Sequence, residues 1–85
     1  MSPRSKRLYV PLRRNDRNAV GITVERLRKA QNLTRNDLAA RAQVSGWDIS
    51  AFVLRGIERG EREVTDIELR KLARALRVPV GVLFE

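Results

Sequence analysis

The sequence contains no cysteine and no histidine among its 85 residues. Without cysteine, neither a disulfide bond nor a thiolate metal site can hold the fold. Without histidine, the chain lacks the commonest general base and zinc ligand, and no Ser-His or Cys-His nucleophile can form. No hydrophobic run approaches the ~20 residues of a membrane span, and the basic N-terminus lacks the apolar stretch of a signal peptide. We therefore expect an intracellular chain that is not an enzyme and that uses no metal, cofactor, small-molecule substrate or membrane.

What remains is a small and strongly basic chain. Eighty-five residues with 42% hydrophobic content can build one compact core. Lysine and arginine number 18 against 10 aspartate and glutamate residues, which gives a net charge of +8. Such an excess of positive charge predicts a polyanionic partner.

The positive charge is concentrated near the N-terminus. Residues 1–17 carry six basic side chains and one acidic side chain, whereas residues 18–85 carry twelve and nine. We therefore expect a basic arm over residues 1–19, extended or disordered by itself, followed by a domain over residues 20–85. The apolar stretch at 8–12 leaves two interpretations open: it packs on the domain, or it pairs as a strand with another chain.

Beyond the arm, apolar residues recur at helical spacing. The pattern predicts helices over 20–31, 35–42, 51–59 and 66–76. Pro79 suits the first turn of a short fifth helix. No alternation typical of strands occurs in this region, so the predicted fold class is all-α, with five short helices around one core.

Capping residues precede three of these helices. Thr34 is followed by Asp37 and Thr65 by Glu68, which is the spacing of a capping box. Ser50 stands directly before the helix over 51–59 and can cap it.

Four short motifs follow one another along the domain. They are Leu-Thr-Arg-Asn-Asp-Leu-Ala at 33–39, Val-Ser at 44–45, Ile-Glu-Arg-Gly-Glu-Arg at 57–62 and Leu-Arg-Lys-Leu-Ala-Arg-Ala-Leu-Arg-Val at 69–78. In this order and spacing they resemble the Cro/lambda-repressor-like (XRE) family of DNA-binding regulators, over about residues 20–84. The resemblance implies a compact five-helix lambda-repressor-like domain with a helix-turn-helix.

The segment between the two central helices departs from the family pattern. It holds about five extra residues around 46–49. A branch of the family with a Gly-Trp-Asp-Ile-Ser-like segment is similar, so we interpret the segment as a variant turn. Ser50 then takes the capping role that the turn serine usually has.

The helix over 51–59 is expected to lie in the major groove of DNA. A helical wheel places four residues on its outer face, and Ala51 adds to them at the helix start. The predicted base-contacting residues are Ala51, Phe52, Arg55, Gly56 and Arg59. Of these, Arg55 can place two donors on guanine O6 and N7.

Phe52 is unusual at a position where family members carry polar residues. Three interpretations remain open. It contacts a thymine methyl group or a base step, it belongs to a protein–protein surface, or the longer connector turns it into the core beside Trp47.

The resemblance also implies contacts with the DNA backbone and one structural ion pair. Phosphate contacts are expected near the start of the helix over 35–42 and around the helix over 51–59. The candidates are Arg35, Asn36, Ser50 and Arg62. Arm residues expected at a minor groove or at phosphates are Arg4, Lys6, Arg7, Arg13, Arg14 and Arg17. Arg28 and Glu58 are expected to form an ion pair that fixes the reading helix.

Together these features predict a sequence-specific double-stranded DNA-binding regulator of the repressor type. We expect a homodimer that is cytoplasmic and nucleoid-associated in a bacterium, or phage-encoded. The C-terminal residues Val80, Val82, Leu83 and Phe84 either form the dimer surface or close the core. The alternative function is a protein-binding adaptor or antitoxin-type module that reuses the same fold.

Overall fold

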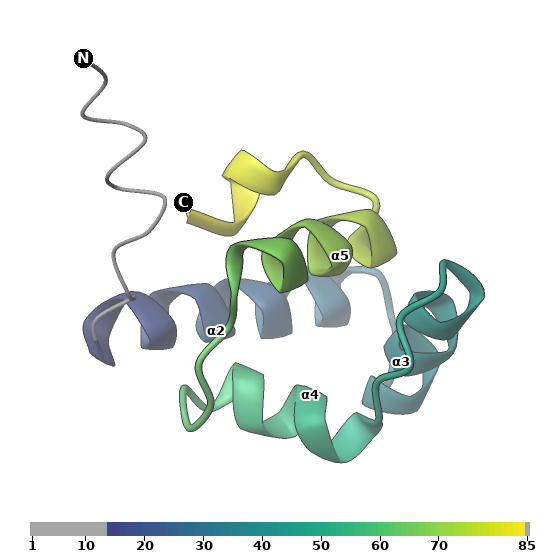
Figure 1. Ribbon diagram of the computed structural model, residues 1–85, viewed down its shortest axis with the longest axis horizontal. Helices are drawn as coiled ribbons and strands as arrows, with labels where there is room; N and C mark the ends of the chain where they lie inside the picture. The colour runs from purple at the N-terminus through teal and green to yellow at the C-terminus, as the bar shows by residue number, and fades with distance from the viewer. Residues whose placement is uncertain (1–13, 85) are drawn as a thin grey trace.

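The computed structural model describes residues 14–84, and all regular structure in this part of the chain is helical. The described residues form four α-helices and a terminal 3₁₀ helix, arranged as in Figure 1. They are α2 (Arg14–Ala30), α3 (Arg35–Val44), α4 (Ala51–Glu58), α5 (Asp66–Leu76) and η1 (Val80–Phe84). The all-α fold class is confirmed, and the predicted fifth helix is a 3₁₀ helix.

The first helix is longer than the sequence pattern predicted. It begins at Arg14 instead of residue 20, so Arg14 and Arg17, assigned to the arm, lie within the bounds of α2. The segment 14–19 is almost entirely polar, so no apolar periodicity marks it. Once a helix is anchored by its packed residues, adding a further turn costs little. At the other helix ends the differences are at most two residues, as is usual for frayed termini.

The predicted capping residues define the starts of α3, α4 and α5. The Thr34 hydroxyl accepts from the backbone N–H of Asp37 at 3.0 Å, and the Asp37 carboxylate accepts from the Thr34 N–H at 2.9 Å. Thr65 and Glu68 form the same reciprocal pair. Ser50 accepts from the N–H of residue 53 at 3.2 Å. These bonds satisfy N–H groups that a helix start otherwise leaves unpaired.

One core holds the helices together. In Figure 1, α2 runs along the molecule between α4 on one side and α5 with η1 on the other, and α3 closes one end against both α4 and α5. The largest fully buried side chains are Leu38, Leu54, Ile57, Leu72, Leu76, Leu83, Val20 and Val24. Every element contributes to this set, so the positions of α3 and α4 are fixed by the same packing.

The lengthened connector between α3 and α4 is anchored by two of its own side chains. Ile49 is buried and Trp47 packs half-buried against the core. Gly46 has a φ of +96°, a conformation that glycine adopts without strain. The Gln43 amide donates to the carbonyl of Ile49 at 3.1 Å. The extra residues therefore form an ordered turn whose aromatic residue fills space at the core.

Gly21 lies where α2 and the C-terminal end of α4 approach each other closely. A Cβ atom at this position would lie 2.4 Å from the carbonyl oxygen of Ile57 and 2.6 Å from that of Glu58. No side chain therefore fits at position 21 of α2. Gly21 therefore fixes how α4 lies on α2, a role that sequence reasoning missed.

Candidate nucleic-acid interface

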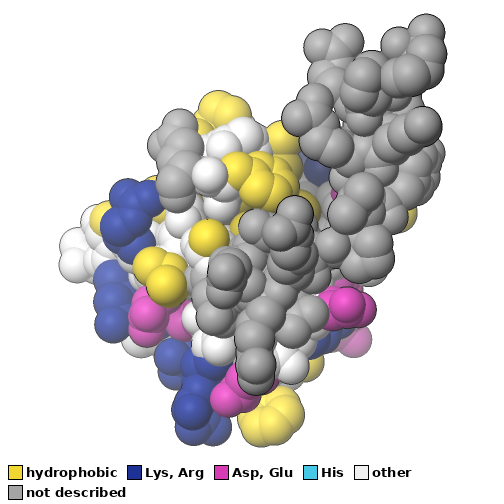
Figure 2. Space-filling view, turned by 90° about the vertical axis from the view of Figure 1, so that its left-hand side faces the viewer, with side chains coloured by type: hydrophobic (Ala, Val, Ile, Leu, Met, Phe, Trp, Pro, Cys, Tyr) yellow, Lys and Arg dark blue, Asp and Glu magenta, His cyan; other side chains and the backbone are white. Residues whose placement is uncertain are grey.

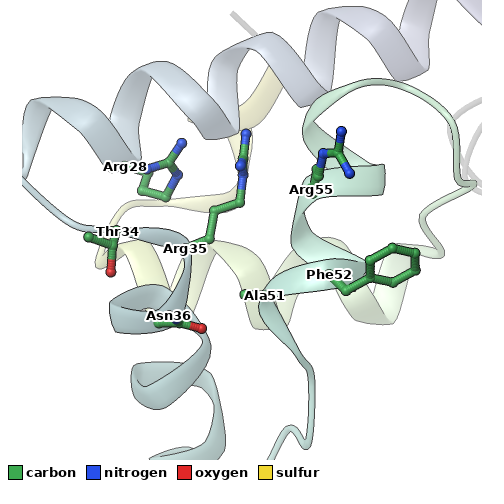
Figure 3. A pocket seen from close by; sticks show the side chains of 7 residues that line it. All are labelled: Arg28, Thr34, Arg35, Asn36, Ala51, Phe52 and Arg55. Carbon is green, nitrogen blue, oxygen red and sulfur yellow. The ribbon is translucent and has the colours of Figure 1, made fainter.

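The N-terminal ends of α3 and α4 border a hollow of about 460 Å³ (Figure 3). Its lining consists of Arg28, Thr34, Arg35, Asn36, Ala51, Phe52 and Arg55. Three of these side chains are cationic and none is acidic. Helix N-termini add partial positive charge from their unpaired N–H groups. The hollow therefore favours an anionic ligand.

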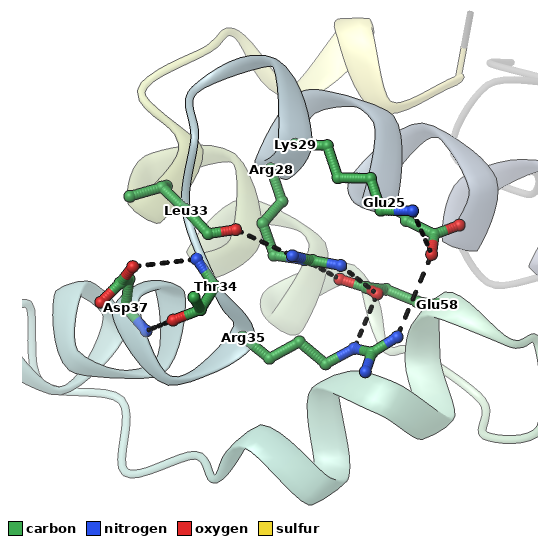
Figure 4. Close-up of polar contacts among 8 residues, drawn as sticks. All are labelled: Glu25, Arg28, Lys29, Leu33, Thr34, Arg35, Asp37 and Glu58. Atoms are coloured by element: carbon green, nitrogen blue, oxygen red, sulfur yellow. Dashed lines mark hydrogen bonds and ion pairs between the residues drawn. The ribbon is translucent and has the colours of Figure 1, made fainter.

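The back of this hollow is built on the ion pair between Arg28 and Glu58 (Figure 4). The Arg28 Nε donates to Glu58 Oε2 at 2.7 Å, and Nη2 donates to Oε1 at 3.1 Å. The Nη1 group donates to the carbonyl of Leu33 at 2.8 Å. The two side chains are only 8% and 1% exposed. The hydrogen bond to Glu58 raises the pKa of Arg28 although burial opposes this, so the pair stays charged.

Arg35 contacts the same carboxylate from α3. Its Nε donates to Glu58 Oε1 at 2.9 Å, and its Nη2 lies 4.0 Å from Glu25 Oε2 (Figure 4). Glu58 thus accepts hydrogen bonds from two guanidinium groups, and Glu25, the other carboxylate near Arg35, also pairs with Lys29. Arg35 remains one-third exposed at the hollow. The sequence had indicated Arg35 as a phosphate contact but gave no sign that Glu58 positions it.

The predicted base-contacting residues lie on the outer face of α4 and, for Arg59, directly after its last residue. Phe52, Arg55 and Arg59 are exposed, and Ala51 and Gly56 are half-buried. Phe52 is 78% exposed, and its ring points away from Arg28 and Arg35 in Figure 3. The interpretation that placed Phe52 in the core is wrong.

Phe52 is exposed because other side chains already fill the core at the connector and along α4. Trp47 and Ile49 already occupy the space under the connector, and Leu54 and Ile57 form the buried face of α4.

A further hollow of about 240 Å³ is lined by Phe52, Val53, Arg55, Gly56, Glu61 and Arg62. Phe52 lines both hollows and forms a ridge between them.

The basic residues beyond α4 have acidic partners. Arg59 Nε lies 3.2 Å from Glu61 Oε2, and Arg62 Nη2 lies 2.9 Å from Glu68 Oε2. Figure 2 shows basic and acidic side chains next to one another on the face where the α4–α5 connector lies. Burial favours a raised pKa for Glu68, but hydrogen bonds from Arg62 and Thr65 outweigh it and lower that pKa. DNA phosphates would have to compete with these carboxylates.

Arg55 differs from these arginines because no carboxylate of the described chain pairs with it. Asn36 is exposed in the first turn of α3, and Ser50 is exposed but its oxygen accepts from a backbone N–H. The structure thus brings Arg35, Asn36 and Arg55 to one hollow. Ser50 and Arg62 lie outside its lining.

The remaining arm candidates, Arg4, Lys6, Arg7 and Arg13, lie outside the described residues. Their contacts with DNA stay a prediction. The contacts of Arg14 and Arg17 with DNA also stay a prediction, because the structure describes only the backbone of these two residues, which lies in α2.

A family comparison agrees with this geometry. The helix-turn-helix family model HTH_3 matches residues 24–83. This chain belongs to the HTH_3 family. The match spans α3, the connector, α4 and α5, and it gives the chain the fold of an XRE-type helix-turn-helix DNA-binding regulator.

Solved structures show the same fold. The restriction-modification controller protein C.AhdI from Aeromonas hydrophila is 30% identical, with a TM-score of 0.73 over 84% of this chain and 96% of that chain. The DNA-binding domain of BldD is 28% identical, with a TM-score of 0.75 over 87% and 100%. The clp gene regulator ClgR from C. glutamicum is 27% identical, with a TM-score of 0.69 over 79% and 80%. No curated protein matches the chain.

Among residues 14–84, no helix is long and apolar enough to cross a membrane. The same residues hold no group of three acidic side chains arranged to bind a metal ion.

Proposed function

We propose that this protein binds double-stranded DNA in a sequence-specific manner and acts as a transcriptional regulator of the repressor type. The observation that carries the proposal is the cationic hollow between the N-terminal ends of α3 and α4, next to the exposed side chains of Phe52 and Arg55. In the helix-turn-helix arrangement, the second helix enters the major groove while the first meets the backbone. The outer face of α4 offers the side chains for such a contact.

Arg55 is the residue we expect to contribute most to base readout. It is exposed on α4, and no described carboxylate neutralises it. A guanidinium can donate to guanine O6 and N7 at once. Arg59 can join it once it releases Glu61. Ala51 and Gly56 permit close approach of the α4 backbone to the bases.

Phe52 supplies an apolar contact on the same face. We propose that its ring packs on a thymine methyl group or against a base step, because it is exposed and forms a ridge between two hollows. A ridge of this kind fits a groove better than a flat surface does.

Phosphate contacts are proposed for the residues around the hollow. Arg35 is held by Glu58 with part of its guanidinium accessible, and Asn36 is exposed beside it. Ser50 and Arg62 flank α4 and can reach phosphates on either side of the groove. Such contacts fix orientation without reading sequence.

We also propose a homodimer on a two-fold related site, with half-sites about 34 Å apart. Val80 and Phe84 of η1 are exposed and supply an apolar surface for it. Leu83 is fully buried and closes the core, so of the predicted C-terminal set it takes no part in the dimer surface. Sedimentation of the protein alone and bound to DNA tests this part.

The test is a selection of duplexes from a random pool, followed by binding titrations with the selected and a shuffled duplex. Arg55→Ala should weaken binding to the selected duplex by about 1–3 kcal/mol and relax specificity at one base pair. It should weaken binding to the shuffled duplex much less. Arg70→Ala, which removes the same charge from the exposed side of α5, is the matched control.

Failure of the selection to enrich any sequence would contradict the proposal. The exposed Phe52 would then favour the alternative function, a protein-binding adaptor or antitoxin-type module. Equal losses in Arg55→Ala and Arg70→Ala would show that only net charge matters and that α4 does not read bases.

A further inference from the structure

A second cationic hollow lies at the end of α3 opposite to the proposed DNA interface. Its volume is about 280 Å³, and it forms where the C-terminal ends of α3 and α5 meet. The lining residues are Arg41, Val44, Ser45, Arg74, Ala75 and Arg77. Three of the six are arginines and none is acidic. We call this the α3–α5 hollow.

Hydrogen bonds from neighbouring elements hold the wall of the α3–α5 hollow in place. Arg41 Nη1 donates to Gln31 Oε1 at 2.9 Å and to the carbonyl of Ala75 at 3.3 Å. Gln31 Nε2 donates to the carbonyl of Leu76 at 2.7 Å. The last carbonyls of α5 are thereby tied to α3 and to the residue that follows α2. Arg41 is fixed with the rest of its guanidinium beside the hollow.

The other two arginines are exposed and unneutralised. No carboxylate of the described chain forms an ion pair with Arg74 or Arg77. This contrasts with Arg59 and Arg62 near α4, which both have acidic partners. The C-terminal ends of α3 and α5 add partial negative charge, about half a unit each, but the three guanidinium groups exceed it. Positive charge at the α3–α5 hollow therefore remains available to a ligand.

The backbone at Arg77 is unusual. Arg77 has φ 61° and ψ 42°, the left-handed conformation at a helix end where glycine is usual. A side chain with a Cβ atom is disfavoured there, and such residues tend to occur where function requires them. Here the arginine places a cation at the rim of the hollow.

Val44 adds an apolar contact to the same site. It is 90% exposed, at the last position of α3. A phosphate backbone offers nothing to a valine, whereas a peptide can offer both carboxylates and an apolar side chain. In Figure 1, α5 and α4 lie on opposite sides of the molecule, so a duplex on α4 leaves the α3–α5 hollow uncovered.

We propose that the α3–α5 hollow docks an acidic segment of a partner protein. Carboxylates of that segment pair with Arg74 and Arg77, and one of its apolar side chains packs on Val44. The charge of the hollow selects the acidic character, and the valine distinguishes a peptide from a free anion. Docking there leaves the proposed DNA interface open, so the two partners can bind together.

The experiment uses the full 85-residue chain and a fluorescein-labelled peptide of alternating Glu and Leu pairs. Comparison peptides replace every Glu by Gln or every Leu by Ser, and inorganic phosphate is the free-anion probe. The test variant combines Arg74→Ala with Arg77→Gly. Glycine relieves the left-handed backbone at residue 77, so a loss of binding there cannot be attributed to backbone strain. Arg55→Ala is the control at the DNA interface.

We expect the Glu–Leu peptide to shift the amide NMR signals of Val44, Ser45 and Arg77 more than those of α4. Binding should weaken about tenfold or more in the Arg74/Arg77 variant and stay unchanged in Arg55→Ala. Both comparison peptides should bind more weakly than the Glu–Leu peptide. DNA affinity should fall in Arg55→Ala and stay unchanged in the Arg74/Arg77 variant.

Three results would overturn the proposal. The first is that the peptide does not bind, or that it shifts the NMR signals of α4 instead of those at the hollow. Phosphate binds in the hollow as well as the peptide does, which reduces the site to one for free anions. The Arg74/Arg77 variant loses DNA affinity as strongly as Arg55→Ala does, which assigns the hollow to the duplex. None of these results depends on which base sequence α4 reads.

Discussion

Arg28 and Glu58 form a bidentate ion pair, although they stand 30 positions apart in the sequence. One belongs to α2 and the other to the last turn of α4, and both are almost completely buried. Arg35 of α3 donates to the same carboxylate. Glu58 therefore links three helices behind the proposed DNA interface.

Removing Glu58 should destabilise the protein strongly. Glu58→Ala leaves Arg28 buried without a countercharge, and breaking a buried pair from one side typically costs about 3–5 kcal/mol. Arg35→Ala should cost less than about 1 kcal/mol, because this side chain is partly exposed and Arg28 still satisfies the carboxylate. Urea unfolding followed by circular dichroism measures both.

A double replacement separates the charge from the packing. Arg28→Met with Glu58→Leu removes both charges, and apolar residues of similar volume often replace a buried pair without loss. The double variant should be more stable than Glu58→Ala. If Glu58→Ala alone unfolds at the same urea concentration as the unmodified protein, the structural role of the pair is refuted.

Gly21→Ala should destabilise the fold, contrary to the usual effect of alanine in a helix. A Cβ at Gly21 meets the carbonyl oxygens of Ile57 and Glu58 at 2.4 and 2.6 Å, and backbone cannot yield as a flexible side chain can. We expect a loss of about 1–3 kcal/mol, typical of overpacking. Gly56→Ala is the matched control, because the nearest atom to its Cβ lies 3.8 Å away.

For the control, alanine should stabilise α4 by up to about 1 kcal/mol. Thermal unfolding of the two variants side by side gives the signs directly. A Gly21→Ala protein that melts at a higher temperature than the unmodified chain would show that α2 and α4 are not in close contact.

Glu68 should make stability depend on pH in the acidic range. Its pKa is lowered in the folded protein, because hydrogen bonds from Arg62 and Thr65 outweigh the effect of burial. A depressed carboxyl pKa contributes stability that is complete above the unfolded value, about 4.3 for glutamate. That contribution is lost as the pH falls through the folded value.

Glu68→Gln keeps the geometry of the capping box but carries no titrating group. The unmodified protein should therefore lose more free energy of unfolding between about pH 5.5 and 3 than Glu68→Gln does. Urea unfolding at a series of pH values measures the difference. Parallel curves for the two proteins would exclude a coupling between Glu68 and folding.

Helix positions and caps could be predicted well from the sequence because they depend on local patterns. The Thr34–Asp37 and Thr65–Glu68 pairs act within one helical turn, so spacing alone predicts them. The start of α2 could not be found this way, since its first turns have no apolar stripe. Apolar periodicity reports on packing and not on helix formation itself.

Contacts between distant segments were only partly predictable. The Arg28–Glu58 pair was expected from the family resemblance, but the third member, Arg35, was expected only at phosphates. The only sign of the role of Gly21 in the sequence was its place within a helical pattern, because a glycine inside a helix often permits close packing. Which backbone it approaches depends on tertiary structure, and the same is true of the α3–α5 hollow.

Phe52→Ala should change DNA binding more than it changes stability. The ring is 78% exposed, and substitutions at exposed positions usually alter stability by less than about 0.5 kcal/mol. Affinity for the selected duplex should fall because the ridge between the two hollows is removed. Urea unfolding and duplex titration on the same preparation give both values, and Val53→Ala serves as a partly buried neighbour for comparison.

If Phe52→Ala lowers stability by several kcal/mol, the ring packs in the folded protein and the exposed position is wrong. If stability and DNA affinity both stay unchanged, Phe52 is no part of the DNA interface. Binding of a protein partner would then be the remaining role for this exposed aromatic residue.

Deleting residues 1–13 should reduce the salt dependence of DNA binding. This segment carries four basic residues and no acidic one, and the deletion ends directly before the start of α2 at Arg14. Each phosphate contact contributes about 0.9 to the slope of log K against log salt on duplex DNA. The deletion should therefore lower the slope by up to about 3–4, with little change in which duplex is preferred.

A chain of unchanged length, with Arg4, Lys6, Arg7 and Arg13 replaced by glutamine, separates charge from length. Equal slopes for this variant and the deletion would attribute the effect to phosphate neutralisation. A change in the preferred duplex would instead place the arm at base edges, because phosphate contacts carry no sequence information. If the slope is the same with and without residues 1–13, these four basic residues do not contact DNA. The measured slope then comes from residues 14–85.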